Sequence, residues 1–350
     1  MPRYFLDLPD EGGPRPWNPH AGPGEEWAET RYFAAVFRAM EPALHEPDLD
    51  FVLTWHTDRL PTYGDRVVAV VQGDEVGMIP RYAARVRAVF KCYGTRPTLG
   101  TGLLRNPGLG GLASLAQCGV RWLRWLPGAA LHARSLAGRK LRGLPMPEPI
   151  TVIPLGTYNQ IDTPLVPIEE RPTDIFFAGS VEHVASLRHR VASPKTYARH
   201  AMITAVERVA AARPGLRLDI RVTPDFQGSE SDSPANYSRA LMDSKICLSP
   251  RGTSLETFRT FEALRCGCIV VGERLPRHWF YEAGPVLELD RWADLDAALR
   301  PLLDDPAELR RQHERSLAWW RDYCSEAALG RFLAARLNEL EPRRHTVLPG

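Results

Sequence analysis

The stretch from residue 244 to residue 272 constrains the fold of this chain more than any other. It holds two short apolar runs, at 246–248 and 268–271, separated by a segment whose apolar residues recur at helical spacing. Continuous apolar runs of this length are typical of parallel strands that are buried on both faces. Gly267 can end the helix between them, because glycine readily adopts the left-handed conformation found there. The stretch therefore predicts a strand–loop–helix–strand unit.

A helix that follows a strand across a short loop has the parts of an anion site. The first N–H groups of a helix have no partner within the helix, and its dipole favours negative charge there. Gly252 allows a ligand to approach the backbone, while Arg251 and Arg259 can make bidentate contacts to a diphosphate. Glu262 can accept hydrogen bonds from ribose hydroxyls. An ordinary strand–helix unit with solvated charges is the alternative. The expected N-cap is Thr253 or Ser254.

This stretch resembles the C-terminal signature of the exostosin-like glycosyltransferases, which have the GT-B architecture. The resemblance covers about thirty residues, over which the motif residues agree in both order and spacing. Val270 stands where that family usually has proline. The matching residues are 244–248 (Ser-Lys-Ile-Cys-Leu), 250–252 (Pro-Arg-Gly), Arg259, 262–264 (Glu-Ala-Leu) and 267–271 (Gly-Cys-Ile-Val-Val). The resemblance implies an α/β fold of the GT-B type, with two Rossmann-like domains facing a cleft and a C-terminal helix crossing back to the first domain.

The rest of the chain supports a division into two α/β domains. A length of 350 residues suits two domains, and residues 143–150 are typical of a linker. We expect an acceptor domain at 1–147, a donor domain at 148–330 and a C-terminal helix or tail at 331–350, with Trp319 and Trp320 buried over the first domain. Residues 9–24 are expected to form a loop. A strand at 174–178 leads into Gly179 and Ser180, where backbone N–H groups can approach phosphate. The candidate donor-binding residues are Gly179, Ser180, Lys195, Arg251, Gly252, Thr253, Ser254, Arg259 and Glu262.

Four polar residues that follow first-domain strands are candidates for a general base. They are His56, Asp58, Asp74 and Glu75, and the sequence does not choose between them. Two Asp-x-Asp motifs, at 48–50 and 294–296, do not follow strands, so we interpret both as structural. We therefore expect no metal and no cofactor, with a nucleotide-diphosphate sugar as co-substrate. The analogy with the family favours inversion, which the residues themselves do not decide.

Residues 108–142 combine leucine, tryptophan and six basic residues with no acidic residue. Pro127 is expected to break this segment into two helices. We interpret these helices as packing on the first sheet, with the arginine stems lying along apolar surface. The alternative is a basic amphipathic helix that contacts an anionic membrane surface.

Composition excludes some classes of protein and leaves others open. The net charge of +2 does not call for nucleic acid as a partner, and no stretch is long and apolar enough to span a membrane. The spacing of the six cysteines fits no zinc or redox motif, and the N-terminus has no apolar signal-peptide core, so we expect a cytoplasmic protein, with a peripheral membrane location as the alternative that residues 108–142 leave open. The favoured function is transfer of a sugar from a nucleotide sugar, such as a UDP-sugar, to a glycan, lipid or small-molecule acceptor. An epimerase, a phosphorylase or a non-enzymatic membrane-associated scaffold remains the alternative.

Overall fold

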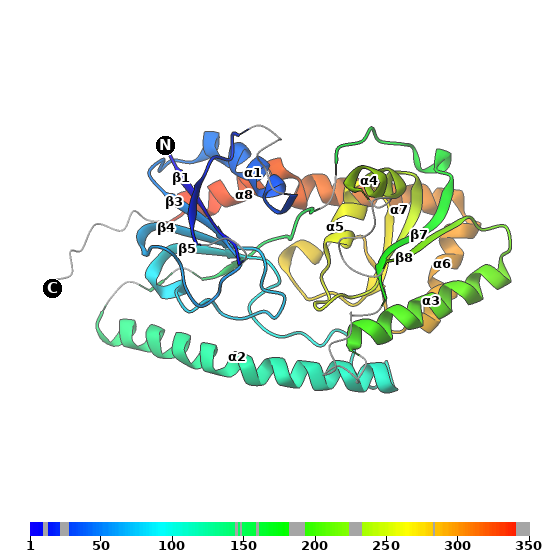
Figure 1. Cartoon of the computed structure of the whole chain (residues 1–350), viewed down its shortest axis with the longest axis horizontal. Coiled ribbons are helices and arrows are strands. Elements are labelled where there is room, and N and C mark those ends of the chain that lie inside the picture. The colour runs from blue at the N-terminus through cyan, green and yellow to red at the C-terminus, as the bar shows by residue number, and fades with distance from the viewer. Residues whose placement is uncertain are drawn as a thin grey trace. The chain divides into compact units, whose positions relative to one another are not determined.

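The computed structural model of the chain contains two compact units (Figure 1). Unit 1 comprises Met1–Pro97, Trp122–Pro154 and Glu326–Gly350, and unit 2 comprises Thr98–Arg121 and Leu155–Ser325. The domain prediction differs in three places, because residues 98–121 group with unit 2, whereas residues 148–154 and 326–330 group with unit 1. The described residues are 1–9, 13–21, 28–143, 146–147, 149–158, 161–181, 193–223, 233–282 and 284–340.

Unit 1 is built on a six-stranded sheet with the order β2-β1-β3-β4-β5-β6. All neighbouring strands pair in parallel except β2, which runs antiparallel to β1 at the edge. The prediction of a loop at 9–24 was therefore wrong at 15–17, where edge pairing gives an isolated short segment its hydrogen bonds. The strands are β1 (Arg3–Asp7), β2 (Arg15–Trp17), β3 (Asp50–Thr54), β4 (Gly64–Val71), β5 (Val86–Lys91) and β6 (Thr151–Val152).

The fully buried strand β3 organises the core of unit 1. Alternate side chains of a strand point to opposite faces, so Phe51 stacks on Tyr4 on one face while Val52 joins an aliphatic cluster on the other. Helix α1 (Ala28–Met40) places Phe37 against the first of these faces. Helix α8 (Glu326–Asn338) packs beside α1, where Gly330 lies against the α1 backbone (Figure 1). Helix α8 therefore packs within unit 1, and residues 341–350 of the expected C-terminal segment lie outside the described residues.

Unit 2 contains a five-stranded, wholly parallel sheet with the order β11-β10-β9-β7-β8. In chain order the sheet first extends from β7 to β8, then returns past β7 to β9 and continues outward. This is a doubly wound sheet, and its direction reverses between β7 and β9. The strands are β7 (Thr173–Ser180), β8 (Leu218–Thr223), β9 (Ser244–Ser249), β10 (Ile269–Glu273) and β11 (Leu287–Leu289).

Helices cover both faces of this second sheet. Phe177 and Leu248 face a core shared with α3 and α6, whereas Phe176 faces Tyr237 of α4 on the other side. The helices are α3 (Pro194–Ala212), α4 (Pro234–Met242), α5 (Phe258–Arg265), α6 (Leu295–Asp304) and α7 (Pro306–Trp319). Short 3₁₀ turns occur at Glu41–Ala43, Ala83–Arg85, Ile168–Glu170, Trp279–Tyr281 and Trp292–Asp294, and a π-helical turn at Trp320–Cys324 ends at Ser325. Two parallel α/β sheets with Rossmann-like connections and a returning C-terminal helix agree with the fold class expected, the α/β arrangement of GT-B proteins.

Three local predictions were wrong. Helix α5 begins at Phe258, several residues after the expected N-cap, because the backbone around Thr253 is held by other contacts. Gly179 and Ser180 lie inside β7 and not after it. Trp319 is buried in unit 2, where its Nε1 donates to the Phe280 carbonyl oxygen at 2.6 Å. Gly267 does end α5 with a φ of +71°, as expected.

Helix α2 (Leu109–Leu141) is continuous, so the expected break at Pro127 does not occur. A proline inside a helix removes one hydrogen bond and costs about 3 kcal/mol. Tertiary contacts on both sides of Pro127 hold the helix in place. Trp125 Nε1 donates to the Thr95 carbonyl oxygen at 2.7 Å, and Arg139 Nη1 donates to the Ala84 carbonyl oxygen at 3.3 Å. Packing therefore outweighs the local preference of the sequence.

Candidate functional site

The strongest ligand-site signal in unit 2 is the point where its sheet reverses direction. Ligands of open α/β sheets bind beyond the carboxyl ends of the strands at such a point. Strand β7 ends in Gly179 and Ser180, and β9 ends at Ser249, directly before Pro250 and Arg251. The sequence placed candidate residues after both strands, and the parallel pairing of β7 with β9 brings the two sets together. Only the strand order identifies this edge as the reversal point.

Three cationic side chains converge on the end of β7. Lys195, in the first turn of α3, donates from Nζ to Ser180 Oγ at 3.1 Å. Arg199, one turn later, is buried and donates to the Ser180 and Arg251 carbonyl oxygens. Arg259 reaches the same place from α5 and donates from Nη2 to the Ala178 carbonyl oxygen. Arg199 was not among the candidate residues, although it lies one helical turn from the candidate Lys195 on the same helix, α3.

Arg259 has more than one buried donor nitrogen without a partner within the described residues. Its Nε and Nη1 are buried and have no hydrogen-bond partner among the residues that the structure describes. Its guanidinium lies 4.8 Å from the ring centroid of Phe177, which fixes its plane. Gly179 makes room for it, because a Cβ there would stand 2.5 Å from Nη2. Two buried cationic donor nitrogens without a partner are costly in the absence of a ligand, so this arrangement favours an anion.

Glu262 is buried on α5 with both carboxylate oxygens engaged. Its Oε1 accepts from the Tyr158 backbone N–H at 3.0 Å, and its Oε2 accepts from the Tyr237 hydroxyl at 2.9 Å. Burial, and then the negative charge of Glu262, hold the pKa of Tyr237 well above its usual range, so the tyrosine stays a donor. A carboxylate oxygen can accept more than one hydrogen bond, which is the chemistry that recognition of a hydroxyl requires.

Arg251 points away from the open edge of the sheet. Its guanidinium is buried and donates from Nη1 to Ser114 Oγ at 3.3 Å and from Nη2 to Gln117 Oε1 at 3.0 Å, both on α2. Burial lowers the pKa of Arg251, and Glu273 opposes this shift. The Arg251 backbone N–H donates to Glu273 Oε2 at 2.9 Å. The structure thus gives this arginine a role in fastening the loop after β9.

The loop after Arg251 is shaped by packing. The Thr253 carbonyl oxygen accepts from Arg121 Nη2 at 2.6 Å, and Ser254 Oγ accepts from the Glu256 N–H at 3.3 Å. Gly252 has only ordinary contacts around the position of a Cβ, the nearest at 3.6 Å. These residues lie beyond the carboxyl end of β9, but they do not form the start of α5.

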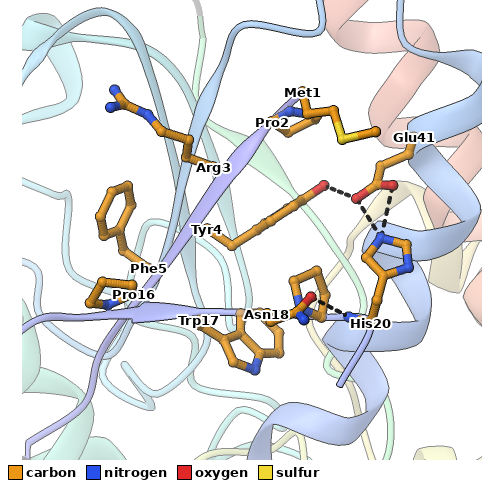
Figure 2. A pocket seen from close by; sticks show the side chains of 11 residues that line it. Met1, Pro2, Arg3, Tyr4, Phe5, Pro16, Trp17, Asn18, His20 and Glu41 are labelled. Atoms are coloured by element: carbon orange, nitrogen blue, oxygen red, sulfur yellow. Dashed lines mark hydrogen bonds and ion pairs between the residues drawn. The ribbon is translucent and has the colours of Figure 1, made fainter. Parts of the chain in front are cut away.

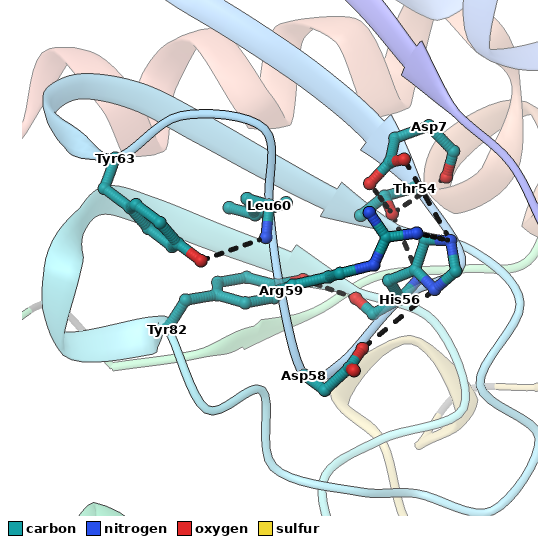
Figure 3. A network of polar contacts seen from close by, with 8 residues as sticks. All are labelled: Asp7, Thr54, His56, Asp58, Arg59, Leu60, Tyr63 and Tyr82. Carbon is teal, nitrogen blue, oxygen red and sulfur yellow. Dashed lines mark hydrogen bonds and ion pairs between the residues drawn. The ribbon is translucent and has the colours of Figure 1, made fainter. Parts of the chain in front are cut away.

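In unit 1, a polar network surrounds His56 at the carboxyl ends of β1 and β3 (Figure 3). His56 Nε2 is 4.0 Å from Oδ1 of the fully buried Asp7, and Nδ1 is 4.0 Å from Oδ1 of the exposed Asp58. Thr54 Oγ1 accepts from the His56 N–H at 3.0 Å, and the Tyr82 hydroxyl donates to the His56 carbonyl oxygen at 2.8 Å. The structure therefore brings two of the base candidates together and adds Asp7.

Asp7 was missed because it stands inside a strand, where the sequence shows only a polar residue in an apolar run. Its partner in the β1–β3 register is Thr54, two residues before His56. Its Oδ1 is buried and has no hydrogen-bond partner in the described part of the chain. A buried carboxylate oxygen beside an imidazole can orient the ring and stabilise its protonated form.

Asp74 has a structural environment, separate from the His56 network. Its Oδ2 accepts from the Met78 N–H at 2.6 Å and lies 3.0 Å from Nζ of Lys91, a side chain with no exposed surface. Its Oδ1 accepts from the Val76 N–H at 3.2 Å. The neighbouring Glu75 is half-buried, and its N–H donates to the Gly73 carbonyl oxygen at 3.1 Å in the same turn.

A surface pocket of about 640 Å³ lies at the opposite end of β1 (Figure 2). Tyr4 and Trp17 line it, and both Tyr4 and His20 bond to Glu41 (Figure 2). The Tyr4 hydroxyl donates to Glu41 Oε1 at 2.6 Å. Burial raises the pKa of Tyr4, and the hydrogen bond to the negatively charged Glu41 raises it further. Because Met1 and Arg3 also line it, this pocket belongs to the amino end of the strand and not to the His56 edge.

The Asp-x-Asp motifs are engaged by arginines or other cations. Asp50 pairs with Arg3 at 2.6 Å, and Asp294 pairs with Arg291 at 3.0 Å. Within the described residues, no group of three or more His, Cys, Asp or Glu side chains could hold a metal ion. No helix in the same ranges is long and apolar enough to cross a membrane. All six cysteines are free and buried.

Comparison with known proteins gives only distant likenesses. No protein-family model matches the chain, and no curated protein matches it. Among solved structures, it is similar to the GtfA/B complex at 13% identity and a TM-score of 0.43, covering 80% of this chain and 58% of that one. It is also similar to the glycosyltransferase SnogD from Streptomyces nogalater, at 13% identity and a TM-score of 0.35, covering 91% of this chain and 82% of that one. The glycotransferase of kitacinnamycin has 12% identity and a TM-score of 0.39, and the match covers 97% of this chain and 100% of that one. These values are too low to assign a function, which must rest on the residues of the chain.

Proposed function

We propose that this protein is a glycosyltransferase that takes a sugar from a nucleotide-diphosphate sugar held by unit 2. The observation that carries the proposal is Arg259, whose buried Nε and Nη1 have no hydrogen-bond partner within the described ranges, at the point where the sheet reverses. The signature at 244–272, which resembles that of the exostosin-like glycosyltransferases, supports the same assignment from the sequence.

In the proposed donor complex, Arg259 and Lys195 bind the diphosphate beside Gly179 and Ser180. The first turn of α3 adds N–H groups and the positive end of the helix dipole. As the bond between the anomeric carbon and the diphosphate oxygen breaks, negative charge grows on that oxygen, and these fixed cations stabilise it. Glu262 accepts a hydrogen bond from a ribose hydroxyl. We propose that the reaction needs no metal ion and no cofactor.

We propose that unit 1 binds the acceptor and supplies the general base. The oxygen of the acceptor hydroxyl attacks the anomeric carbon from the side opposite the diphosphate, which inverts the configuration at that carbon. His56 takes the proton of this hydroxyl during the attack. Asp7 orients the imidazole and stabilises its charged form, because Asp7 Oδ1 lies 4.0 Å from His56 Nε2 and is a buried acceptor with no hydrogen-bond partner among the described residues. Asp74 is a poorer base, since Lys91 and two backbone N–H groups occupy its carboxylate. The acceptor is a hydroxyl of a glycan, a lipid or a small molecule.

Titration of nucleoside diphosphates by calorimetry tests the first step of this proposal. We expect UDP, GDP, ADP or dTDP to bind with one site per chain, and the corresponding nucleoside to bind far more weakly. A chain that binds none of them would contradict the donor site and favour the scaffold alternative.

Turnover with a mixture of nucleotide sugars and acceptors tests the reaction itself. A transferase releases the nucleoside diphosphate and forms a glycosylated acceptor, both of which mass spectrometry detects. Conversion of the donor to an isomer without release would identify an epimerase. Release of a sugar 1-phosphate that requires inorganic phosphate would identify a phosphorylase.

A further inference from the structure

Helix α2 exposes an apolar face along its whole length. Leu123 is 70% exposed, and many of the chain's other exposed large apolar side chains belong to the same helix. At 100° per residue, most of these positions fall on one side of the helix, together with small alanines and glycine. The exposed apolar residues of α2 are Leu109, Leu112, Leu115, Val120, Trp122, Leu123, Leu126, Leu131 and Leu141.

The opposite side of α2 carries its buried contacts, and several of these are polar. Ser114 and Gln117 accept from Arg251, and Arg121 is buried with its guanidinium donating to the Thr253 carbonyl oxygen. Trp125 donates to a backbone carbonyl oxygen from the same side. This reverses the usual pattern of a surface helix, in which the apolar stripe faces the core. The prediction that the leucines of 108–142 pack on the sheet was therefore wrong.

The charges on α2 indicate which kind of partner the exposed apolar face can bind. Residues 108–142 contain no acidic side chain. Arg124, Arg134, Lys140 and Arg142 are exposed around the apolar stripe. Two copies of this face brought together would place these cations against one another without a counter-charge, which disfavours self-association. An apolar stripe whose charged neighbours on the helix are all cations matches an anionic lipid surface, where acyl chains meet negative headgroups.

We propose that α2 binds anionic membrane surfaces, lying in the plane of the bilayer with its leucine face among the upper acyl chains. The helix does not span, because no described helix of this chain is long and apolar enough to do so. Its 33 residues give a platform of about 50 Å at 1.5 Å per residue. Trp122 is exposed beside this stripe, and its ring suits the boundary between headgroups and acyl chains. The inference rests on α2 alone and does not depend on the proposed transferase activity.

Co-flotation of the full chain with vesicles tests this inference. We expect binding to vesicles containing 30% phosphatidylglycerol and little binding to pure phosphatidylcholine, with the bound fraction falling steeply as salt rises from 0.1 to 0.5 M. Leu123→Gln together with Leu126→Gln is expected to weaken partitioning about a hundredfold, since each leucine loses its apolar burial. Arg134→Gln is expected to weaken it about fivefold, the value of one cation near an anionic surface.

Matched controls separate the helix face from surface hydrophobicity in general. Leu165 is as exposed as Leu126, at 53%, so Leu165→Gln is expected to leave binding unchanged. Arg331→Gln removes an exposed arginine on α8 as the control for charge. Glutamine is a good helix former, so α2 persists in the variants, which far-ultraviolet circular dichroism verifies. Absence of binding to anionic vesicles would overturn the proposal, and so would a dimer that the leucine variants dissociate.

Discussion

Replacing Arg259 by methionine separates a ligand-binding arginine from a structural one. In the free protein this side chain makes one hydrogen bond, from Nη2 to the Ala178 carbonyl oxygen, and lies over the Phe177 ring. Its Nε and Nη1 are buried without a hydrogen-bond partner in the part of the chain that the structure describes. Methionine keeps much of the apolar stem and removes both the charge and the unpaired donors.

The expected magnitudes follow from these contacts. Losing the hydrogen bond and the ring contact costs about 2 kcal/mol of folding stability, and removing two buried unpaired donors returns about the same. The free energy of unfolding should therefore change by less than about 1 kcal/mol. Binding of a nucleoside diphosphate should weaken by about 1.5–3 kcal/mol, the value of hydrogen bonds to a charged group, which corresponds to a roughly tenfold to hundredfold higher Kd.

Calorimetry with UDP or GDP measures the Kd, and urea denaturation without ligand measures the stability. Arg265→Met is the matched control, because Arg265 lies on the same helix and pairs with Asp162 at 2.5 Å. It should leave the Kd unchanged. An Arg259→Met variant that binds diphosphate normally, or that loses several kcal/mol of stability, would refute the reasoning.

Four other perturbations test the remaining assignments. Asp7→Asn should lower kcat by about a hundredfold or more at unchanged KM for the donor, and His56→Gln should lower it at least as much. If Asp7 only maintained the structure of the site, steady-state kinetics would show a raised KM as well as a lowered kcat. Asp74→Ala should cost about 3–5 kcal/mol in urea denaturation by leaving the ammonium of Lys91 buried and unpaired, and Asp74→Leu with Lys91→Met should recover most of that stability. Burial lowers the pKa of His313, so neutral His313 is favoured in the folded state; stability should decline as pH falls below about 6.5, and His313→Gln should flatten this part of a Tm–pH profile. Turnover should persist in EDTA, and its complete loss, restored by Mg²⁺ or Mn²⁺, would contradict metal independence.

The sequence by itself determined the central strands of unit 2 and the helix between two of them. The apolar runs at 246–248 and 268–271 formed β9 and β10, and Gly267 ended the helix between them. These features could be predicted because burial on both faces requires unbroken apolar residues, and a helix end requires a residue that tolerates positive φ. The start of α7 at Pro306 has a similar local origin, because proline is favoured in the first turn of a helix.

Tertiary structure alone decided which residues meet. The strand order made the ends of β7 and β9 the reversal point, and it turned Arg251 toward α2 while leaving Arg259 with buried donors to spare. Asp7 joined His56 only through the register of β1 with β3. Contacts on both sides of Pro127 kept α2 whole and turned its leucines outward. Periodicity shows that a helix has two faces, but which face is covered depends on residues far away in the chain, and local patterns carry no information about them.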